Sequence, residues 1–268
     1  MMARRAVSVG AVVASAVAVS AAASVAVLLP AEDGPSRPQA RPVAAAAARP
    51  LAGKVVVIDP GHNGRNHKYP KVINRKVPAG PFRKACDTTG TATDSGYAEH
   101  AYTFDVATRL ARLLRAQGAT VHLTRPNNAG VGPCVNQRAA LGNKVRAHAA
   151  ISIHADGASS KRRGFHVIVP GYVKGYTGPI VKPSKWLGYD VRYAFRKGTG
   201  QPYANYIGRN GLDVRTDLGG LNLSKVPKVF IECGNMRNAT DAARMRNAAW
   251  RQRAAVSLAT GMAHYLKR

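Results

Sequence analysis

Two histidines and two glutamates have the residue types of a metal-dependent hydrolytic site: His62, Glu99, His154 and Glu232. Two neutral imidazoles and one carboxylate are the usual protein ligands of a catalytic zinc ion, and they leave a fourth position for water. The second carboxylate is then free to act as a general base. Either Glu99 or Glu232 fits either role, because spacing along the chain does not decide between ligand and base.

These four residues lie at the ends of predicted secondary-structure elements. Three apolar runs of strand length stop beside three of them: residues 54–59 before His62, residues 149–153 before His154, and residues 228–232 at Glu232. Glu99 falls in the first turn of a helix predicted over residues 97–117. If the three strands are neighbours, the four side chains face one cleft, since functional groups of α/β sheets gather at the carboxyl ends of the strands.

Strands and helices alternate along the rest of the chain. Further strands are predicted at residues 119–124 and 165–169, and further helices at residues 135–147, 184–196 and 239–266. This alternation predicts an α/β fold with helices on both faces of a sheet. Residues 64–95 are polar and contain Gly, Pro, Lys and Thr throughout, which predicts a long loop or a hairpin insertion.

Each of the four residues also has an ordinary structural explanation. A single histidine after a strand is more often a hydrogen-bonded structural residue, and the helix dipole favours a glutamate at a helix start. The chain has only eight His and 13 acidic residues. Because four of these residues lie at the ends of elements that would converge, one metal site explains their positions better than four unrelated structural roles.

Five motifs follow one another between residues 54 and 268. They are residues 57–64 (VIDPGHNG), Glu99 at a helix start, residues 123–125 (LTR), residues 151–156 (ISIHAD) and residues 229–235 (VFIECGN). In this order they resemble the motifs of the zinc-dependent N-acetylmuramoyl-L-alanine amidases of the amidase 3 type, most of all the secreted actinobacterial members with one catalytic domain. The resemblance implies a mixed, mostly parallel central sheet of about six strands, flanked by helices on both faces.

The resemblance also implies a role for each candidate residue. His62, Glu99 and His154 would bind one zinc ion and Glu232 would be the catalytic carboxylate, which decides the choice that spacing left open. The implied reaction is hydrolysis of the amide between the lactyl group of N-acetylmuramic acid and L-alanine, in peptidoglycan or muropeptides. Two rival functions are a zinc peptidase acting on peptidoglycan stem peptides and a non-catalytic basic protein that binds the cell wall.

Two features depart from the commonest pattern of the family. The interval from His62 to Glu99 is longer than in compact members because it contains the insertion at about 64–95, and the usual Glu-Lys pair is here Glu99-His100. The insertion either shapes substrate access or is a structural loop, and we favour a structural role. His67 and His100 flank the site and rank below the matched positions as metal ligands.

The first fifty residues are predicted to lie outside the fold. Arg4 and Arg5 precede an almost uncharged run at residues 6–29, which is the order of a secretory signal, although such a run also has the length of a membrane anchor. We therefore expect residues 1–30 to be a signal peptide or N-terminal anchor, residues 31–50 to be a Pro/Ala-rich linker, and residues 51–268 to be the catalytic domain. The expected location is extracytoplasmic, secreted or in the cell wall.

Three cysteines are too few for a disulfide scaffold. Cys86 and Cys134 lie in predicted loops of a chain expected to be exported, so we predict that they form a disulfide that braces the insertion against the loop after the second strand. Cys233 adjoins the strand that ends at Glu232 and is predicted to be a small buried residue rather than a nucleophile.

Positive charge dominates the whole chain, with 40 Lys and Arg against 13 Asp and Glu. Residues 1–50 hold five of the Arg and two of the acids, so 35 basic and 11 acidic residues belong to the folded part. This excess favours electrostatic binding to anionic wall polymers. Nucleic acid is not an expected partner, because zinc-finger spacing and aromatic-basic RNA motifs are both missing from the sequence. We expect a monomer.

Overall fold

A six-stranded sheet forms the centre of the protein in its computed structural model, which describes residues 49–268. In order across the sheet, the strands are β4 (Thr120–Leu123), β1 (Val55–Pro60), β5 (Ala149–Asp156), β8 (Lys228–Asn235), β6 (His166–Pro170) and β7 (Leu212–Arg215). The first four are mutually parallel; β6 is antiparallel to β8, and β7 pairs parallel with β6. The predicted mixed, mostly parallel sheet is therefore confirmed. The signal peptide or anchor predicted at residues 1–30 and nearly all of the linker predicted at 31–50 lie outside the described residues.

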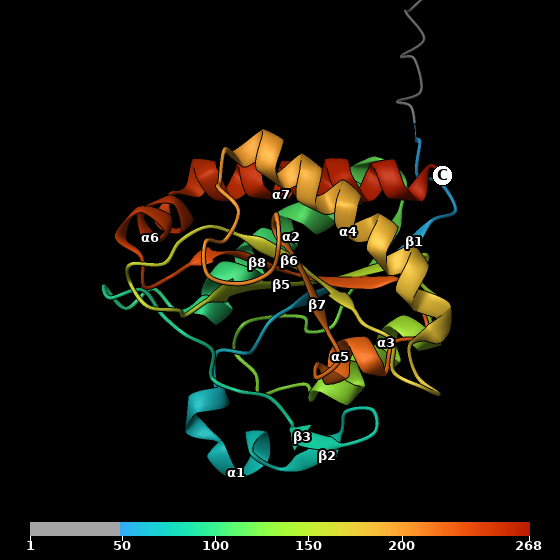
Figure 1. Cartoon of the computed structure of the whole chain (residues 1–268), viewed down its shortest axis with the longest axis horizontal. Coiled ribbons are helices and arrows are strands. Elements are labelled where there is room, and N and C mark those ends of the chain that lie inside the picture. The colour runs from blue at the N-terminus through green and yellow to red at the C-terminus, as the bar shows by residue number, and fades with distance from the viewer. Residues whose placement is uncertain (1–48) are drawn as a thin grey trace, which may run out of the picture. The chain divides into compact units, whose positions relative to one another are not determined.

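Helices cover both faces of this sheet, as the alternation predicts (Figure 1). One face carries α2 (Glu99–Ala116), α4 (Gly178–Thr199) and α7 (Ala248–Leu266), with α6 (Ala239–Arg246) before α7. The other face carries α3 (Val135–Lys144) and the short α5 (Gly219–Asn222). None of the helices within residues 49–268 combines the length and the apolar character that a membrane crossing requires.

The insertion at residues 64–95 forms a small layer beside α3 and α5 with its helical turns and hairpin, and its last residues lead back to the start of α2 (Figure 1). It contains a 3-10 turn (η1, Asn66–Lys68), the one-turn helix α1 (Pro70–Ile73), and an antiparallel hairpin of β2 (Lys76–Pro78) and β3 (Arg83–Ala85). The hairpin alternative of the sequence prediction is thus present, although it accounts for only part of the segment.

The structure corrects the predicted boundaries of two helices and two strands. The terminal helix predicted at 239–266 is two helices, because Asn247 leaves the helical conformation and its side chain accepts a hydrogen bond from the Trp250 N–H as the N-cap of α7. The helix predicted at 184–196 begins earlier and runs through Pro183. Both β5 and β8 continue past the residues at which the predicted strands end, so His154 and Glu232 lie within their strands.

Side chains of the central strands alternate between a face that is apolar throughout and a face that also carries polar groups. The apolar face packs under α2, α4 and α7 in one large core and includes Ile58, Ile151, Ile153, Val229 and Ile231. The opposite face holds a smaller apolar cluster with Val57 and Ala150, and toward the carboxyl ends of the strands it carries the side chains of Asp59, Ser152, His154, Phe230 and Glu232. In the sheet register Asp59 lies beside Ser152 and His154 lies beside Glu232. Strand pairing alone therefore brings these groups together.

Candidate metal centre

Three of the four predicted residues form one compact cluster. The donor atoms of His62, Glu99 and His154 all lie within 4.8 Å of one another. The two oxygens of Glu99 face different imidazoles: Oε1 lies 3.0 Å from Nδ1 of His154, and Oε2 lies 3.2 Å from Nε2 of His62. The imidazole rings meet edge to face, with their centroids 5.0 Å apart. Residues far apart in the sequence thus present two nitrogens and a carboxylate to one small volume.

Glu99 is a buried carboxylate held rigidly at the first position of α2. The Thr91 N–H donates to Oε2 at 2.9 Å and the Ala155 N–H donates to Oε1 at 3.1 Å. Burial alone would raise the pKa of Glu99, but His62 and His154 outweigh it and hold this pKa well below its usual range. The carboxylate is therefore ionised and its two oxygens keep a fixed direction.

His62 adopts a strained left-handed conformation just after β1, with φ of 59°. Its Nδ1 lies 3.1 Å from the Thr88 carbonyl oxygen and 3.4 Å from an Asp87 carboxylate oxygen. Burial opposes the charged imidazole, yet the adjacent Glu99 and Asp87 raise the pKa of His62 to about 10. The site therefore strongly favours a positive charge beside Glu99, and this charge can come from a proton or from a cation.

Two glycines allow the backbone to approach the cluster. A Cβ on Gly61 would collide with the imidazole of His154. A Cβ on Gly90 would lie 2.7 Å from a ring carbon of His62 and 2.8 Å from Oε2 of Glu99, and Gly90 also has a positive φ of 78°. Neither position accepts a side chain unless a member of the cluster moves.

Glu232 lies next to the cluster but outside its set of donor atoms. It is the register partner of His154 in β8 and is partly buried, and its Oε2 has no hydrogen-bond partner within the described part of the chain. Burial, together with the negative charges of Glu99 and Asp156, raises the pKa of Glu232 well above its ordinary value. Glu232 therefore binds a proton more readily than an ordinary glutamate does.

A histidine that the sequence patterns do not indicate lies on the other side of Glu232. His166 of β6 is the second register partner of Glu232, its side chain is buried, and within residues 49–268 its Nδ1 has no hydrogen-bond partner. Burial lowers the pKa of His166, so the ring favours its neutral form. The only available signal was strand parity, which places every second residue of 165–169 on the face that carries Glu232.

The two lower-ranked histidines do not join the cluster. His100 turns its Nδ1 to the amide oxygen of Asn128, 3.0 Å away. His67 lies exposed in η1. The structure therefore separates both from the group formed by His62, Glu99 and His154.

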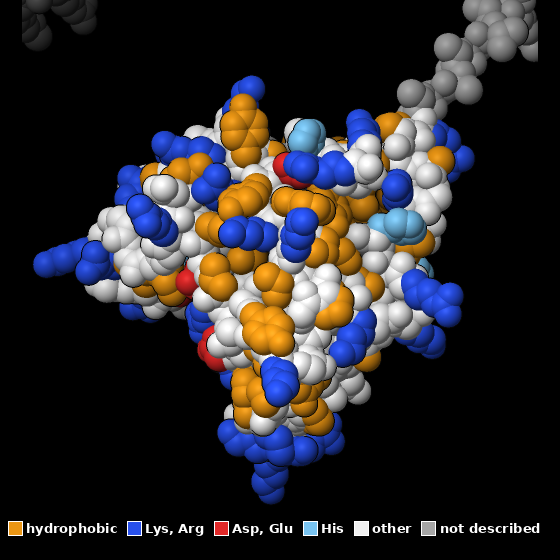
Figure 2. Space-filling model, turned by 45° about the vertical axis from the view of Figure 1, so that its right-hand side comes forward, with side chains coloured by type: hydrophobic (Ala, Val, Ile, Leu, Met, Phe, Trp, Pro, Cys, Tyr) orange, Lys and Arg blue, Asp and Glu red, His pale blue; other side chains and the backbone are white. Residues whose placement is uncertain are grey.

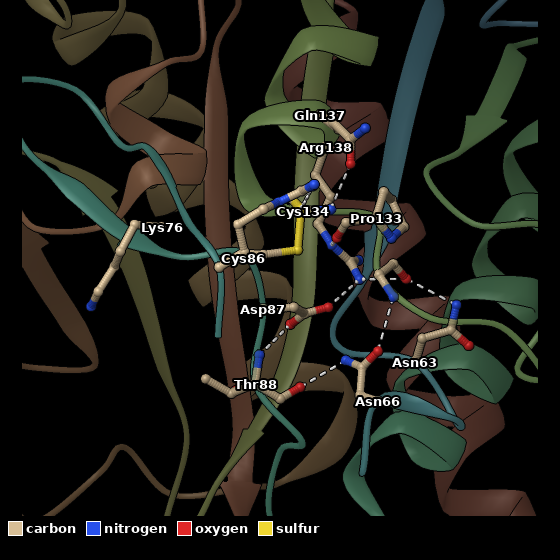
Figure 3. The surroundings of a disulfide bond; sticks show 12 residues. Asn63, Asn66, Lys76, Cys86, Asp87, Thr88, Pro133, Cys134, Gln137 and Arg138 are labelled. Carbon is tan, nitrogen blue, oxygen red and sulfur yellow. Dashed lines mark hydrogen bonds and ion pairs between the residues drawn. A yellow bond between two sulfur atoms is a disulfide. The ribbon is translucent and has the colours of Figure 1, made fainter. Parts of the chain in front are cut away.

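A buried chain of charges supports the turn that carries His62, and Figure 3 shows its Arg138–Asp87 pair. Asp59 at the end of β1 contacts the Arg138 guanidinium at 2.9 Å and the Lys228 ammonium at 3.3 Å. Arg138 also donates to Asp87 at 2.9 Å and to the His62 carbonyl oxygen at 3.0 Å. Burial would raise the pKa of Asp59, but the two cations hold it far below its usual range. This network fixes both the backbone of His62 and a carboxylate beside its imidazole.

A cavity of about 190 Å³ opens from the cluster toward the insertion. Its lining includes the imidazoles of His62 and His154, Lys84 of the hairpin, and the backbone of Gly219 and Gly220 around α5. One wall of the space next to the cluster is therefore built by the insertion. The predicted structural role and the alternative role in substrate access are both compatible with this position.

The predicted disulfide between Cys86 and Cys134 is present, and Cys233 is a buried free thiol. The bond joins the strand end of the hairpin to the residue before α3 (Figure 3). Asp87 and Thr88, which both contact His62, directly follow Cys86. The disulfide therefore braces the insertion and also the support of one cluster residue.

Removing this bond is expected to destabilise the protein. Cys86 and Cys134 are separated by 48 residues, and closing a loop of that length stabilises the folded state by about 2–4 kcal/mol. We expect a Cys86→Ala/Cys134→Ala variant to lose stability of that order and to lose activity as well, because Asp87 and Thr88 become less ordered. Denaturant unfolding with and without reductant measures the first effect, and equal stability of wild type and variant without reductant would contradict it.

The donor set suits one zinc ion. Zinc binds histidine nitrogens and carboxylate oxygens at about 2.0–2.2 Å, and a two-histidine, one-carboxylate set is typical of catalytic sites. The ionised buried carboxylate of Glu99, placed between two imidazoles, supplies the negative charge that such an ion requires. The cluster as it stands thus fits the metal that the sequence predicts.

The fold and this cluster define an α/β protein with a candidate mononuclear metal centre toward the carboxyl ends of its parallel strands. Residues 56–264 match the family model described as N-acetylmuramoyl-L-alanine amidase, and the chain belongs to this family. The family inferred from the motifs is therefore confirmed.

Relatives of known name agree with this assignment. The chain is 42% identical over 229 residues to the N-acetylmuramoyl-L-alanine amidase Rv3717 of Mycobacterium tuberculosis, which covers 84% of this chain and 92% of that protein. The crystal structure of the N-acetylmuramyl-L-alanine amidase Ami1 from Mycobacterium smegmatis matches with a TM-score of 0.76 and 41% identity, over 81% of this chain and 98% of that one. The apo form of Ami1 from Mycobacterium abscessus matches with a TM-score of 0.75 and 38% identity, over 80% and 99%.

Proposed function

We propose that the protein is a zinc-dependent N-acetylmuramoyl-L-alanine amidase in which His62, Glu99 and His154 hold one zinc ion and Glu232 transfers protons. The observation that carries this proposal is the convergence of two imidazoles and an ionised carboxylate, with a second carboxylate as the register partner of His154. Peptidoglycan or a muropeptide is the substrate, cut at the amide between the lactyl group and L-alanine.

A bound zinc ion would supply the Lewis acid that polarises the substrate carbonyl and acidifies a water molecule at the site. Glu232 takes a proton from the attacking water and passes it to the departing alanine amine, so that one carboxylate serves as base and then as acid. Its Oε2 suits this work because no group in the described part of the chain already occupies it. Glu99 keeps both imidazoles in place, and Arg138 fixes the backbone at His62.

The deciding experiment is mass spectrometry of a purified muropeptide after incubation with the zinc-loaded protein. The amidase yields a sugar that ends in a free lactyl carboxylate and an intact stem peptide with a free alanine amine. The rival zinc peptidase would instead shorten the stem peptide. Muropeptide that binds without any change in mass would indicate the other rival, a non-catalytic wall-binding protein.

Removal of one imidazole is expected to abolish both zinc binding and hydrolysis. Replacing His154 by alanine leaves two protein donors in place of three, and loss of a ligand costs far more zinc affinity than the tenfold to hundredfold typical of losing an outer contact. Zinc content after dialysis and hydrolysis of muropeptide measure the two effects in one preparation. His100→Ala is the matched control, since His100 contacts Asn128 outside the cluster. A His154→Ala protein with full zinc content would contradict the proposed ligand set.

We also propose that residues 1–30 direct export or anchor the chain, that residues 31–50 link them to the catalytic domain, and that this domain works outside the cytoplasm as a monomer. The Cys86–Cys134 disulfide supports export, because such bonds persist mainly in oxidising compartments. The excess of 35 basic over 11 acidic residues beyond position 50 supports attraction to anionic wall polymers.

A further inference from the structure

An aromatic stripe runs along the outward face of α4. Trp186, Tyr189 and Tyr193 follow one another at intervals of three and four residues, which places them on one side of a helix. Their exposed fractions are 42%, 39% and 63%. Lys182 and Lys197 extend the stripe by one turn at each end, so it spans about 22 Å of helix. These large rings are not needed for the core beneath α4, which is filled by Leu187, Val191 and Phe195.

Every ring of the stripe has a cationic side chain beside it. The ammonium of Lys182 lies 5.2 Å from the Trp186 ring, and that of Lys197 lies 5.8 Å from the Tyr193 ring. The Tyr189 ring has Arg192 at 5.5 Å and Lys185 at 5.9 Å. Figure 2, which turns the side bearing α4 forward, shows hydrophobic and basic side chains interspersed with very few acidic ones. The surface therefore combines flat apolar rings with closely spaced positive charge.

The single acid of α4 does not offset this charge. The sequence of α4 contains five basic residues and one acid, Asp190. Asp190 is already paired, since its oxygen lies 2.8 Å from the Arg268 guanidinium and 3.0 Å from Nδ1 of His264. Each end of the stripe also borders a hollow: one of about 540 Å³ beside Trp186, and one of about 430 Å³ between Tyr193 and α7. Positive charge, exposed rings and concave edges occur together here.

We propose that this α4 surface, defined by Lys182, Trp186, Tyr189, Tyr193 and Lys197, binds an anionic polysaccharide. The flat rings offer stacking faces for the apolar faces of sugars, and the adjacent ammonium and guanidinium groups pair with carboxylates or phosphates along the chain. A membrane surface is a poorer fit: two of the three rings carry hydroxyl groups, and Val256 is the only large aliphatic side chain exposed near them on α7 within the described residues.

The position of the surface allows binding and catalysis at the same time. α4 covers the apolar face of the sheet, whereas His154 and Glu232 point to the opposite face. A polymer bound to α4 would therefore keep the enzyme near the cell wall that contains its proposed substrate, and the metal centre would stay uncovered. The inference rests on the proposed function only for the source of the polymer, and binding can be measured apart from hydrolysis.

The test is binding of the full chain to polygalacturonate, a linear carboxylated sugar polymer, with neutral dextran and phosphatidylglycerol-containing vesicles as further arms. We expect clear binding to polygalacturonate that weakens with added salt. Replacing Trp186 and Tyr193 together by alanine should weaken it about tenfold, a loss of ~1.4 kcal/mol of binding free energy shared between the two stacked rings. A Lys182→Gln/Lys197→Gln variant should also bind more weakly and show a smaller salt dependence.

Matched controls come from the insertion. Tyr69→Ala removes a ring with a similar exposed fraction, 38%, and Lys71→Gln/Lys76→Gln removes two exposed charges. Both controls should bind polygalacturonate like the wild type, and the two α4 variants should hydrolyse a soluble muropeptide at the wild-type rate. Wild-type affinity in either α4 variant, equal binding to dextran, or vesicle binding that falls in the α4 variants while polygalacturonate binding does not, would overturn the proposal. If the wild-type protein does not hydrolyse the muropeptide at all, that result would count against the proposed function alone.

Discussion

Replacing Glu232 by glutamine is expected to lower kcat on a soluble muropeptide by about 100-fold to 10,000-fold, the usual contribution of general acid–base catalysis. The amide of glutamine fills nearly the same space but cannot accept a proton from water and return it to the departing amine. Glu232 lies outside the donor cluster of His62, Glu99 and His154. The variant should therefore bind zinc as the wild type does.

The control for this change is Asp94→Asn, an equivalent loss of one carboxylate at an exposed ion pair with Arg237. Its rate should match the wild type. A Glu232→Gln protein that hydrolyses muropeptide at the wild-type rate would remove Glu232 from the reaction. A variant that loses zinc along with activity would show that Glu232 is a ligand, the alternative that spacing alone left open.

Replacing Asp59 by asparagine is expected to destabilise the fold by about 3–5 kcal/mol, because it leaves buried cations without their shared counter-charge. Lys228 is the more affected of the two: its ammonium pairs only with Asp59 within the described residues, whereas Arg138 keeps Asp87. Guanidinium unfolding of wild type and variant measures the difference in the free energy of unfolding. Because Asp59 lies under the His62 turn, some loss of activity should accompany it.

A double variant and a pH series sharpen this second prediction. Asp59→Asn/Lys228→Met removes the stranded charge and should recover part of the lost stability. The pKa of Asp59 is lowered by folding, so its contribution is fully present above about pH 4, the pKa of an unfolded aspartate. The contribution declines as pH falls toward the lowered folded pKa. A stability difference between wild type and Asp59→Asn that grows as pH falls from 6 to 3 would contradict this account.

The sheet and the cluster could be predicted because their signals are local. Apolar runs of strand length that stop at Pro60, or directly before His154, define the central strands without reference to the rest of the fold. Parallel strands then place their carboxyl ends on one edge of the sheet, so the distant residues His62 and His154 had to meet if those strands were neighbours. The strand register confirms that β1 and β5, which carry these residues at or near their ends, are neighbours.

The supporting residues could not be predicted, because their signals depend on packing. Arg138 and Lys228 are charged residues that a sequence pattern assigns to solvent, yet Asp59 neutralises both in the interior. His166 gains its place beside Glu232 only through the antiparallel pairing of β6 with β8. Asn247 looked like an ordinary helix residue and instead caps α7. Each depends on a partner distant in sequence or on a backbone change that periodicity does not report.

The most direct test is a calorimetric titration of Zn²⁺ into the metal-free full chain. The predicted result is one tight site per chain, lost in His62→Asn, Glu99→Gln and His154→Asn and kept in Glu232→Gln. Equal zinc affinity in all four variants, or tight binding that disappears only with Glu232, would contradict the assignment of ligands and base.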